Sequence, residues 1–274
     1  MRDGVAMSTV IETYSRLALE YDDPENVDSC WGLVGRHSLG LIAVEDTHKV
    51  VVDVGCGVGR DLANLASRYS PDVWFIGIEP AANMREIAVK RTAEYPNVKV
   101  LDGRLENLPL ESGSVDYLYS ILAFHWTTDL DKSVSELARV LKPAGEMDLA
   151  FIGRYNGREF IRKTTPVFFK YMTPAMMVEA ASLRKQLTVE QASALFGKAF
   201  GSHRLSVEES YHTYYDTLEA HLAWWVRIEA QLVNIPQGVR VECDQAVRAA
   251  IATLETERGI PYTVHLLHVR LRDT

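Results

Sequence analysis

The stretch VVDVGCGVGR, residues 51–60, decides the fold of this chain. It begins as an apolar, β-branched run, which is typical of a strand buried on both faces, and it ends in three glycines at every second position, Gly55, Gly57 and Gly59. The next segment, RDLANLASRY at residues 60–69, places apolar residues at helical spacing. A strand, a glycine-rich turn and a helix therefore succeed one another, and such a turn brings the backbone close to a ligand.

The same alternation of strand and helix continues through the middle of the chain. Further strands are predicted at residues 73–79, 98–101, 115–122 and 146–152. Helices are predicted between them at residues 81–95 and 129–145. The second helix carries one apolar stripe and is expected to stop at Pro143 and Gly145; the stripe is Leu130, Val134, Leu137 and Leu141. Helical connections imply right-handed crossovers and a parallel sheet with helices on both faces, and ligands bind such sheets beyond the carboxyl ends of the strands.

The pattern changes after residue 152. Residues 157–200 predict two or three short helices rich in aromatic residues and methionine, interrupted at Pro166 and Pro174. Two more helices are expected after a sixth strand, and a last strand closes the chain; these elements lie at residues 203–214, 217–232, 239–258 and 262–272. We interpret the helices around the sixth strand as insertions that form a lid over the sheet edge.

Composition restricts the class of partner. The formal net charge of −8 over 274 residues, with no run rich in lysine and arginine, argues against a nucleic-acid partner. No apolar segment approaches the ~18 residues that span a bilayer, and the N-terminal residues lack the apolar region of a signal peptide. Cys30, Cys56 and Cys243 lie too far apart to signal a disulfide framework or a zinc site. We expect a cytoplasmic protein with a small-molecule partner, no membrane partner and no metal.

The glycine spacing bears on which ligand the turn accepts. A dinucleotide fingerprint places its third glycine three residues after the second, where this chain has Arg60. Asp53, two residues before Gly55, would repel an anionic pyrophosphate at a helix N-terminus. A nicotinamide-dependent oxidoreductase is therefore disfavoured, and a ligand that carries an ammonium and a sulfonium group would be attracted.

The D-x-G-x-G-x-G motif at residues 53–59 resembles motif I of the class I S-adenosylmethionine-dependent methyltransferases. Three further segments match that family in order and spacing: GIEPAANM at 77–84, LENLPLESGSVDYLYS at 105–120 and ARVLKPAGEMDLAF at 138–151. The resemblance covers about residues 14–152 and the last strand. It implies an α/β, Rossmann-like fold: a seven-stranded, mostly parallel sheet with helices on both faces and a helical lid inserted around the sixth strand.

The resemblance also implies one methyltransferase domain over residues 1–274, with S-adenosyl-L-methionine as the cofactor. Its predicted parts are N-terminal lid helices in 1–48, a cofactor-binding core in 49–152, helical insertions with the sixth strand in 153–258 and the last strand in 259–274. The helices of the insertion offer an apolar face through which a homodimer could form.

By the same resemblance, Asp53 would hold the methionine amino group through water, and Glu79 would accept both ribose hydroxyls. The family often has an aspartate after the third strand that accepts from the exocyclic amine of adenine, whereas this chain has Arg104 there, followed by Leu105. Arg104 could stack on the base, or Asp102 could replace the missing acceptor. The full set of predicted cofactor-binding residues is Tyr14, Asp53, Gly55, Cys56, Gly57, Gly59, Glu79, Pro80, Met84, Arg104, Leu105 and Leu122.

The segment LAFHWTTD at residues 122–129 bears on the acceptor. It lacks the (N/D)-P-P-(Y/F) sequence of methyltransferases that act on amides or exocyclic amines, and its HW pair resembles the branch that methylates small carboxylic acids, including the trans-aconitate enzymes. His125, the predicted catalytic residue, could be a general base, could hydrogen-bond a substrate carboxylate, or could bond a backbone carbonyl as a structural histidine. Substrate contacts are predicted for Tyr21, Phe124, Trp126, Arg154 and Trp224.

The predicted function is methyl transfer from S-adenosylmethionine to a small metabolite at oxygen, with a carboxylate as one candidate. Two alternatives stay open at this point. One is N- or C-methylation of a natural-product intermediate under the same lid. The other is a methyltransferase-like protein that binds the cofactor without transferring its methyl group.

Overall fold

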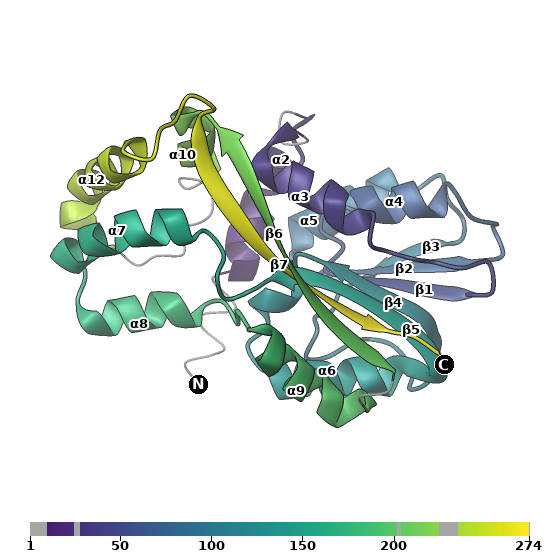
Figure 1. Ribbon diagram of the computed structural model, residues 1–274. Coiled ribbons are helices and arrows are strands. Elements are labelled where there is room, and N and C mark those ends of the chain that lie inside the picture. The colour runs from purple at the N-terminus through teal and green to yellow at the C-terminus, as the bar shows by residue number, and fades with distance from the viewer. Residues whose placement is uncertain (1–9, 25–27, 202–203, 225–234, 274) are drawn as a thin grey trace.

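A seven-stranded sheet lies at the centre of the computed structural model, which describes residues 10–24, 28–201, 204–224 and 235–273 (Figure 1). The strand order is β3-β2-β1-β4-β5-β7-β6. The first five strands are parallel and β7 is antiparallel to both of its neighbours. The strands are β1 (Val50–Val54), β2 (Trp74–Ile78), β3 (Val98–Leu101), β4 (Val115–Ile121), β5 (Leu141–Ile152), β6 (Leu205–Asp216) and β7 (Ile260–Leu271). The predicted fold class is confirmed.

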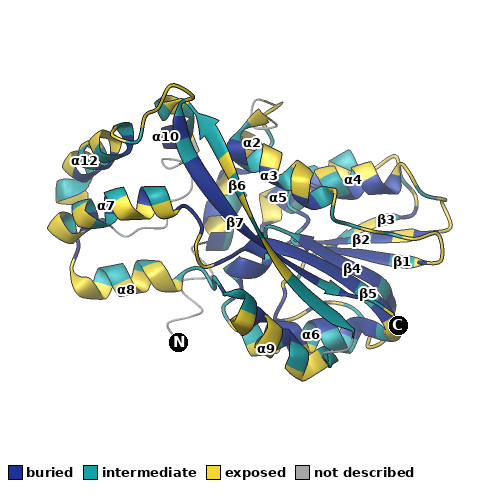
Figure 2. Cartoon of the chain, viewed as in Figure 1, coloured by how far each residue is buried: buried dark blue, intermediate teal, exposed yellow. Residues whose placement is uncertain are grey.

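Helices cover both faces of this sheet (Figure 1). One face carries α2 (Ala18–Tyr21), α3 (Cys30–Leu39), α4 (Arg60–Ala66) and α5 (Ala82–Arg91). The other face carries α6 (Leu130–Val140) and α9 (Val189–Phe200). Residues 10–16 are also helical, and a 3-10 turn, η2 (Phe124–Trp126), follows β4. The central strands β4, β5 and β7 contain long buried runs, whereas β6 at the sheet edge is half-buried to exposed (Figure 2).

A second group of helices lies beyond the end of the parallel strands. In the half of β7 at residues 260–265 the strand pairs with β6 alone, so the two strands extend past β5 as a ribbon. The helices beside this ribbon are α7 (Arg158–Tyr171), α8 (Pro174–Ser182), α10 (Leu218–Trp224) and α12 (Arg240–Ala252), with η4 (Gln237–Val239) before the last (Figure 1). Ile161, Phe169 and Val178 are exposed apolar side chains on α7 and α8. A homodimer through such a face stays a prediction.

Two of the differences from the sequence prediction involve proline. The helix α6 ends at Val140, and Leu141 opens β5 opposite Val115 instead of closing the helical stripe. The residue before Pro143 is driven to extended backbone, which favours an early strand. Pro166 does not interrupt α7, because it lies on the exposed side of the helix, where the carbonyl that loses its partner can bond water. Pro174 does begin a helix, as the first residue of α8.

No helix in the described part of the chain is both long and apolar enough to cross a membrane.

Candidate cofactor and acceptor site

Two cavities adjoin at the carboxyl ends of the parallel strands. The larger has a volume of about 670 Å³ and the smaller about 130 Å³. The residues that line both are Tyr14, Tyr21, Gly55, Gly57, Ile121, Leu122 and Trp126. The glycine turn and the segment after β4 therefore form the junction between the cavities, at the sheet edge where parallel α/β folds bind their ligands.

The turn after β1 is held by the carboxylate at the end of β2. Glu79 is buried and lines the smaller cavity. Its Oε2 accepts a hydrogen bond from the Gly57 N–H at 2.9 Å, and its Oε1 accepts one from the Ala81 N–H at 2.8 Å. Burial raises the pKa of this carboxyl, while the two backbone N–H groups counteract that rise. Each oxygen retains a lone pair with which it can accept a further hydrogen bond from a ligand.

The three glycines of the turn are required for different reasons. All three have positive φ, +80° at Gly55, +55° at Gly57 and +72° at Gly59. A Cβ on Gly55 would lie 2.3 Å from the Cβ of Ala123, and one on Gly59 would lie 2.8 Å from the Cβ of Ala88. A Cβ on Gly57 would meet no atom within 4 Å. Packing therefore demands glycine at the first and third positions, whereas Gly57 faces open space in the cavities.

Leu122 is the one non-glycine residue with positive φ in the described ranges, at +56°. It follows β4, its N–H donates to the Ala150 carbonyl at 2.8 Å, and it lines both cavities. A branched side chain in this conformation costs about 1–2 kcal/mol. Such strain is typical of a functional site and here it turns the chain directly into η2.

The smaller cavity contains most of the residues predicted to surround the cofactor. Pro80, Met84, Arg104 and Leu105 line it together with two residues that the sequence did not single out, Glu106 and Thr127. Asp102, considered as the replacement acceptor for adenine, lies elsewhere. Its side chain is 72% exposed and pairs with Arg85 at 3.2 Å.

Asp53 and Cys56 lie deeper than the prediction assumed. Asp53 is buried in β1 and is absent from the described residues that line the two cavities. Burial and the nearby Asp61 raise its pKa well above the usual range. Its water-mediated contact with the cofactor stays a prediction. Cys56 lines the larger cavity, but burial raises the pKa of its thiol, so the unreactive thiol form is favoured.

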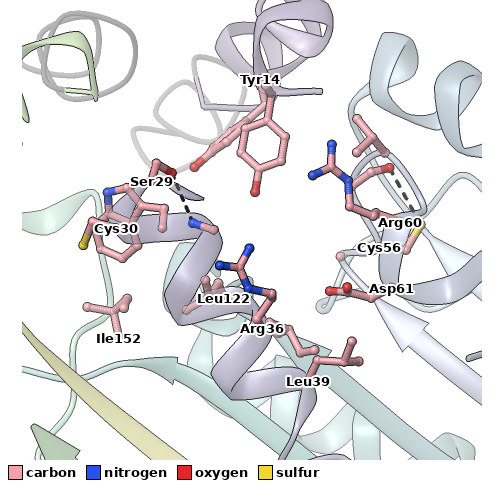
Figure 3. Close-up of a pocket in the computed structure, with 18 of the residues that line it drawn as sticks. Tyr14, Ser29, Cys30, Arg36, Leu39, Cys56, Arg60, Asp61, Leu122 and Ile152 are labelled. Atoms are coloured by element: carbon pink, nitrogen blue, oxygen red, sulfur yellow. Dashed lines mark hydrogen bonds between the residues drawn. The ribbon is translucent and has the colours of Figure 1, made fainter. Parts of the chain in front are cut away.

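Charged and aromatic side chains line the larger cavity from the N-terminal helices and from the start of α4 (Figure 3). The figure shows Tyr14, Arg36, Arg60 and Asp61 around this space. Two of the arginines have carboxylate partners at 3.1 Å, Arg36 with Asp28 and Arg60 with Asp22. Their charges are therefore largely compensated by the protein itself.

Aromatic rings flank the junction of the cavities. The ring centroids of Tyr14 and Trp126 lie 5.8 Å apart, and those of Tyr14 and Tyr21 lie 6.0 Å apart, both edge-to-face. The face of an aromatic ring attracts a cation. Tyr14, Tyr21 and Trp126 thus line both cavities, and their contacts with a ligand stay predictions.

His125 lines the larger cavity from η2. It is 4% exposed, and its Nδ1 has no hydrogen-bond partner among the described residues. Burial, and secondarily the charge of Arg184, holds its pKa well below the usual 6.5. His125 is consequently neutral at pH 7, and its free Nδ1 distinguishes it from a structural histidine satisfied on both nitrogens.

Arg184 was not singled out from the sequence, yet it lies beside His125 in the larger cavity. Its guanidinium carbon is 4.7 Å from the centroid of the Trp126 ring. The segment between α8 and α9 is anchored at both ends, because the Lys185 N–H donates to the His125 carbonyl at 2.8 Å and the Arg154 N–H donates to the Leu187 carbonyl at 2.9 Å. A lone arginine outside any motif carries no sequence signal, so only these long-range contacts reveal its position.

Two predicted substrate residues, Phe124 and Arg154, are absent from the described linings of the cavities. The turn η2 points His125 and Trp126 toward the cavities and Phe124 toward the sheet, where its ring lies 4.9 Å from that of Phe151. Phe124 is fully buried and is a core residue. Arg154 is exposed and lines neither cavity. The side chain of Trp224, at the end of α10, lies outside the described residues.

Within the described ranges, no cluster of three or more histidine, cysteine or acidic side chains could hold a metal ion.

The neutral state of His125 predicts a dependence of stability on pH. The unfolded histidine binds a proton near pH 6.5, whereas the folded one resists protonation to a lower pH. The unfolded state therefore binds more protons, and the free energy of unfolding should fall as pH drops below about 6.5. Urea unfolding between pH 7.5 and 5.5 measures this slope. His125→Gln should flatten it, although other buried histidines contribute; an unchanged slope would contradict the neutral assignment.

Known proteins resemble this chain in both sequence and fold. Residues 51–145 match the family described as "Methyltransferase domain". A malonyl-[acyl-carrier protein] O-methyltransferase of Dechloromonas aromatica is 34% identical over 142 residues, 52% of this chain and 50% of the relative. A trans-aconitate 2-methyltransferase of Deinococcus radiodurans is 35% identical over 107 residues, 39% of each chain. This chain thus spans half or less of these curated relatives.

Among solved structures, the YcgJ protein of Bacillus subtilis aligns with 87% of this chain and 99% of its own, with a TM-score of 0.59 and 19% identity, so it supports the fold. The resemblance read from the motifs is confirmed. Residues 51–145 thus match the methyltransferase domain family, and the seven-stranded sheet built around them has the predicted Rossmann-like fold.

Proposed function

We propose that this protein transfers a methyl group from S-adenosylmethionine to an oxygen of a small metabolite that carries a carboxylate. The observation that carries the proposal is the junction of the two cavities at Gly57. A buried glutamate lies on one side of that junction. A neutral histidine and an arginine lie on the other.

The smaller cavity suits the adenosine half of the cofactor. Glu79 has oxygen lone pairs for the ribose hydroxyls, and Pro80, Met84 and Leu105 offer apolar contacts to the base. The open space at Gly57 leaves room for the cofactor to pass from one cavity to the other. When bound, the cofactor would supply an electrophilic methyl group on a positively charged sulfur, and the rings of Tyr14 and Trp126 flank the place where that charge would lie.

The larger cavity suits an anionic acceptor. The planar guanidinium of Arg184 matches the two oxygens of a carboxylate, and Trp126 supports it from one face. A carboxylate is already ionised at neutral pH, so its oxygen needs no base before it attacks the methyl group. His125, which stays neutral, would then position the acceptor by a hydrogen bond instead of removing a proton. Positioning of this kind can lower a barrier by ~7–11 kcal/mol.

The names of the relatives agree with this chemistry. One acts, by its name, on a malonyl group and the other on trans-aconitate, and both groups carry a free carboxylate. Because this chain covers half or less of each, the acceptor of this protein is a proposal argued from its own larger cavity.

Methyl-labelled S-adenosylmethionine tests the proposal directly. The full chain is incubated with trans-aconitate, with other small di- and tricarboxylates, and with their fully esterified forms as matched controls. We expect label in a base-labile ester product from the free acids and none from the esters, and loss of transfer in Glu79→Ala. A base-stable product would indicate N- or C-methylation instead. Binding of S-adenosylhomocysteine without transfer to any acid would indicate a protein that only binds the cofactor.

A further inference from the structure

One wall of the larger cavity is apolar and aromatic. The side chains of this apolar wall come from α3, from the ends of β4 and β5 and from β7: Cys30, Trp31, Leu122, Ile152 and Tyr262. All five belong to one packed cluster, in which Trp31 and Leu122 are only half-buried. Figure 3 shows Cys30 and Ile152 on the opposite side of the space from Arg60 and Asp61. The apolar wall is therefore separate from the charged side of the cavity.

Two rings of the apolar wall form a fixed pair. The centroids of Trp31 and Tyr262 lie 5.9 Å apart in an edge-to-face arrangement. Tyr262 is held in place, because its hydroxyl accepts a hydrogen bond from Asn156 Nδ2 at 2.9 Å and its ring lies 4.9 Å from that of Phe160. Trp31 is half-buried and lines the cavity, so it keeps ring surface that a ligand can cover. A ligand ring packed against this pair would gain aromatic contacts as well as burial of apolar area.

Arg184 lies close to the same wall. Burial raises the pKa of the Tyr262 phenol, and the nearby charge of Arg184 counteracts that rise. The guanidinium also lies over Trp126, on the side of the cavity where the segment after β4 begins. A ligand whose carboxylate meets Arg184 can thus place the rest of its body along the apolar wall.

The charged residues of the cavity do not favour a second carboxylate on that ligand. Four arginines belong to the described lining: Arg36, Arg60, Arg68 and Arg184. The first two are paired with aspartates at 3.1 Å and the third is exposed, so Arg184 is the one best placed to hold a carboxylate. Asp216 lines the cavity near Cys30, where burial and then the charge of Asp216 raise the pKa of the Cys30 thiol to about 12. A second carboxylate along the wall would approach Asp216 and be repelled.

We propose that the acceptor is a monocarboxylic acid with an aromatic body, which meets Arg184 with its carboxylate and the rings of Trp31 and Tyr262 with its own ring. The inference rests on the proposed function, because it names the class of acid that would receive the methyl group. In that pose a carboxylate oxygen bonds the methyl carbon while the carbon–sulfur bond breaks and its electron pair stays on sulfur. The products are a neutral methyl ester and S-adenosylhomocysteine.

Three acids that share an α,β-unsaturated carboxylate test this inference. Crotonate carries a methyl group, trans-cinnamate carries a phenyl ring and trans-aconitate carries further carboxylates. The acids compete at equal concentration for the labelled methyl group in the presence of the full chain, so the product ratio equals the ratio of kcat/KM. Burial of the phenyl ring should favour trans-cinnamate over each of the others on the order of 10- to 100-fold. Equal or greater transfer to trans-aconitate would overturn the inference and leave the proposed function standing.

Calorimetric titration of the same acids into the chain saturated with S-adenosylhomocysteine measures binding without turnover. We expect trans-cinnamate to bind tighter than the other two by a similar factor. Such a preference without transfer to any acid would support the inference for the cavity and refute the proposed function. Failure of trans-cinnamate to bind would overturn the inference. If S-adenosylhomocysteine itself does not bind, the proposed cofactor is wrong and the inference fails with it.

The substitution Trp31→Ala distinguishes contact with the ligand ring from support of the fold. It should lower kcat/KM for trans-cinnamate on the order of 10-fold and change that for crotonate little, because crotonate has no ring to lose a contact. Equal losses for both acids would show that Trp31 acts only through the fold. Trp74→Ala is the matched control, since Trp74 is 42% exposed on β2 and lines neither cavity in the described structure. If Trp31→Ala does not fold, Trp31→Leu provides the same comparison, because leucine keeps apolar volume and removes the ring.

Discussion

Replacement of Gly57 by leucine should abolish binding of S-adenosylhomocysteine while the protein stays folded. The backbone at Gly57 has φ +55°, and an added Cβ would meet no protein atom within 4 Å, so the new side chain would extend into the junction of the two cavities. Overfilling a packed site costs ~1–3 kcal/mol, and a leucine in the path of the ligand should reach or exceed the upper end. We expect an affinity loss on the order of 100-fold or more in calorimetric titration.

Gly113→Leu is the matched control for this experiment. Gly113 also has a positive φ, +64°, and an added Cβ there would meet nothing within 4 Å, but it lines neither cavity in the described structure. In both variants a side chain at positive φ should lower the free energy of unfolding by a similar amount, about 1–2 kcal/mol, which thermal unfolding would measure. Only Gly57→Leu should lose the ligand. Equal binding by the two variants would refute the placement of the cofactor at the glycine turn.

Replacement of Arg184 by glutamine should weaken binding of the carboxylate acceptor and leave binding of the cofactor unchanged. Arg184 lies over Trp126 and beside His125 in the larger cavity, and it is absent from the described lining of the smaller cavity, which contains Glu79. Loss of a hydrogen bond to a charged group costs about 1.5–3 kcal/mol. We expect KM for the best acid of the labelled panel to rise by about 10- to 150-fold. The affinity for S-adenosylhomocysteine should change little.

Arg154→Gln is the corresponding control, because Arg154 precedes the same region of the fold but is exposed and lines neither cavity. Its kinetic constants should stay close to those of the wild type. Arg184→Lys should restore only part of the lost affinity, since a lysine cannot bond both carboxylate oxygens in one plane. An unchanged KM in Arg184→Gln would exclude this arginine from acceptor binding.

The core of the fold was predictable because its signals are local. A buried parallel strand is a short β-branched run, and the turn after β1 needs glycine at Gly55 and Gly59 for reasons of close packing. Glu79 ends the neighbouring strand, so the parallel register of β1 and β2 brings it to the turn, where it bonds the Gly57 N–H. The apolar pattern of the strands, the spacing of the glycines and the order of the strands together predicted the sheet. They also predicted that the glycine turn and Glu79 lie at one edge of it.

The acceptor half was less predictable because it depends on which way single side chains point. Within η2, Phe124 enters the core while His125 and Trp126 line the larger cavity, and a sequence of three aromatic residues does not distinguish these directions. Asp53 was predicted to reach the cofactor through water; it is buried in β1, and that contact stays a prediction. Proline at position 166 was expected to break a helix that in fact continues through it.

By itself the sequence determined the sheet, the glycine turn and the acidic residue that holds it, because each follows from periodicity and from backbone conformations that only glycine readily adopts. The tertiary structure decided the rest. Arg184 reaches the larger cavity through a lid segment whose anchors lie some 30 to 60 residues away in the chain, at Arg154 and His125. Glu106 is held at the smaller cavity by Thr127 and Thr128, some 20 residues further on. Contacts across such separations leave no local pattern, so only the folded chain reveals them.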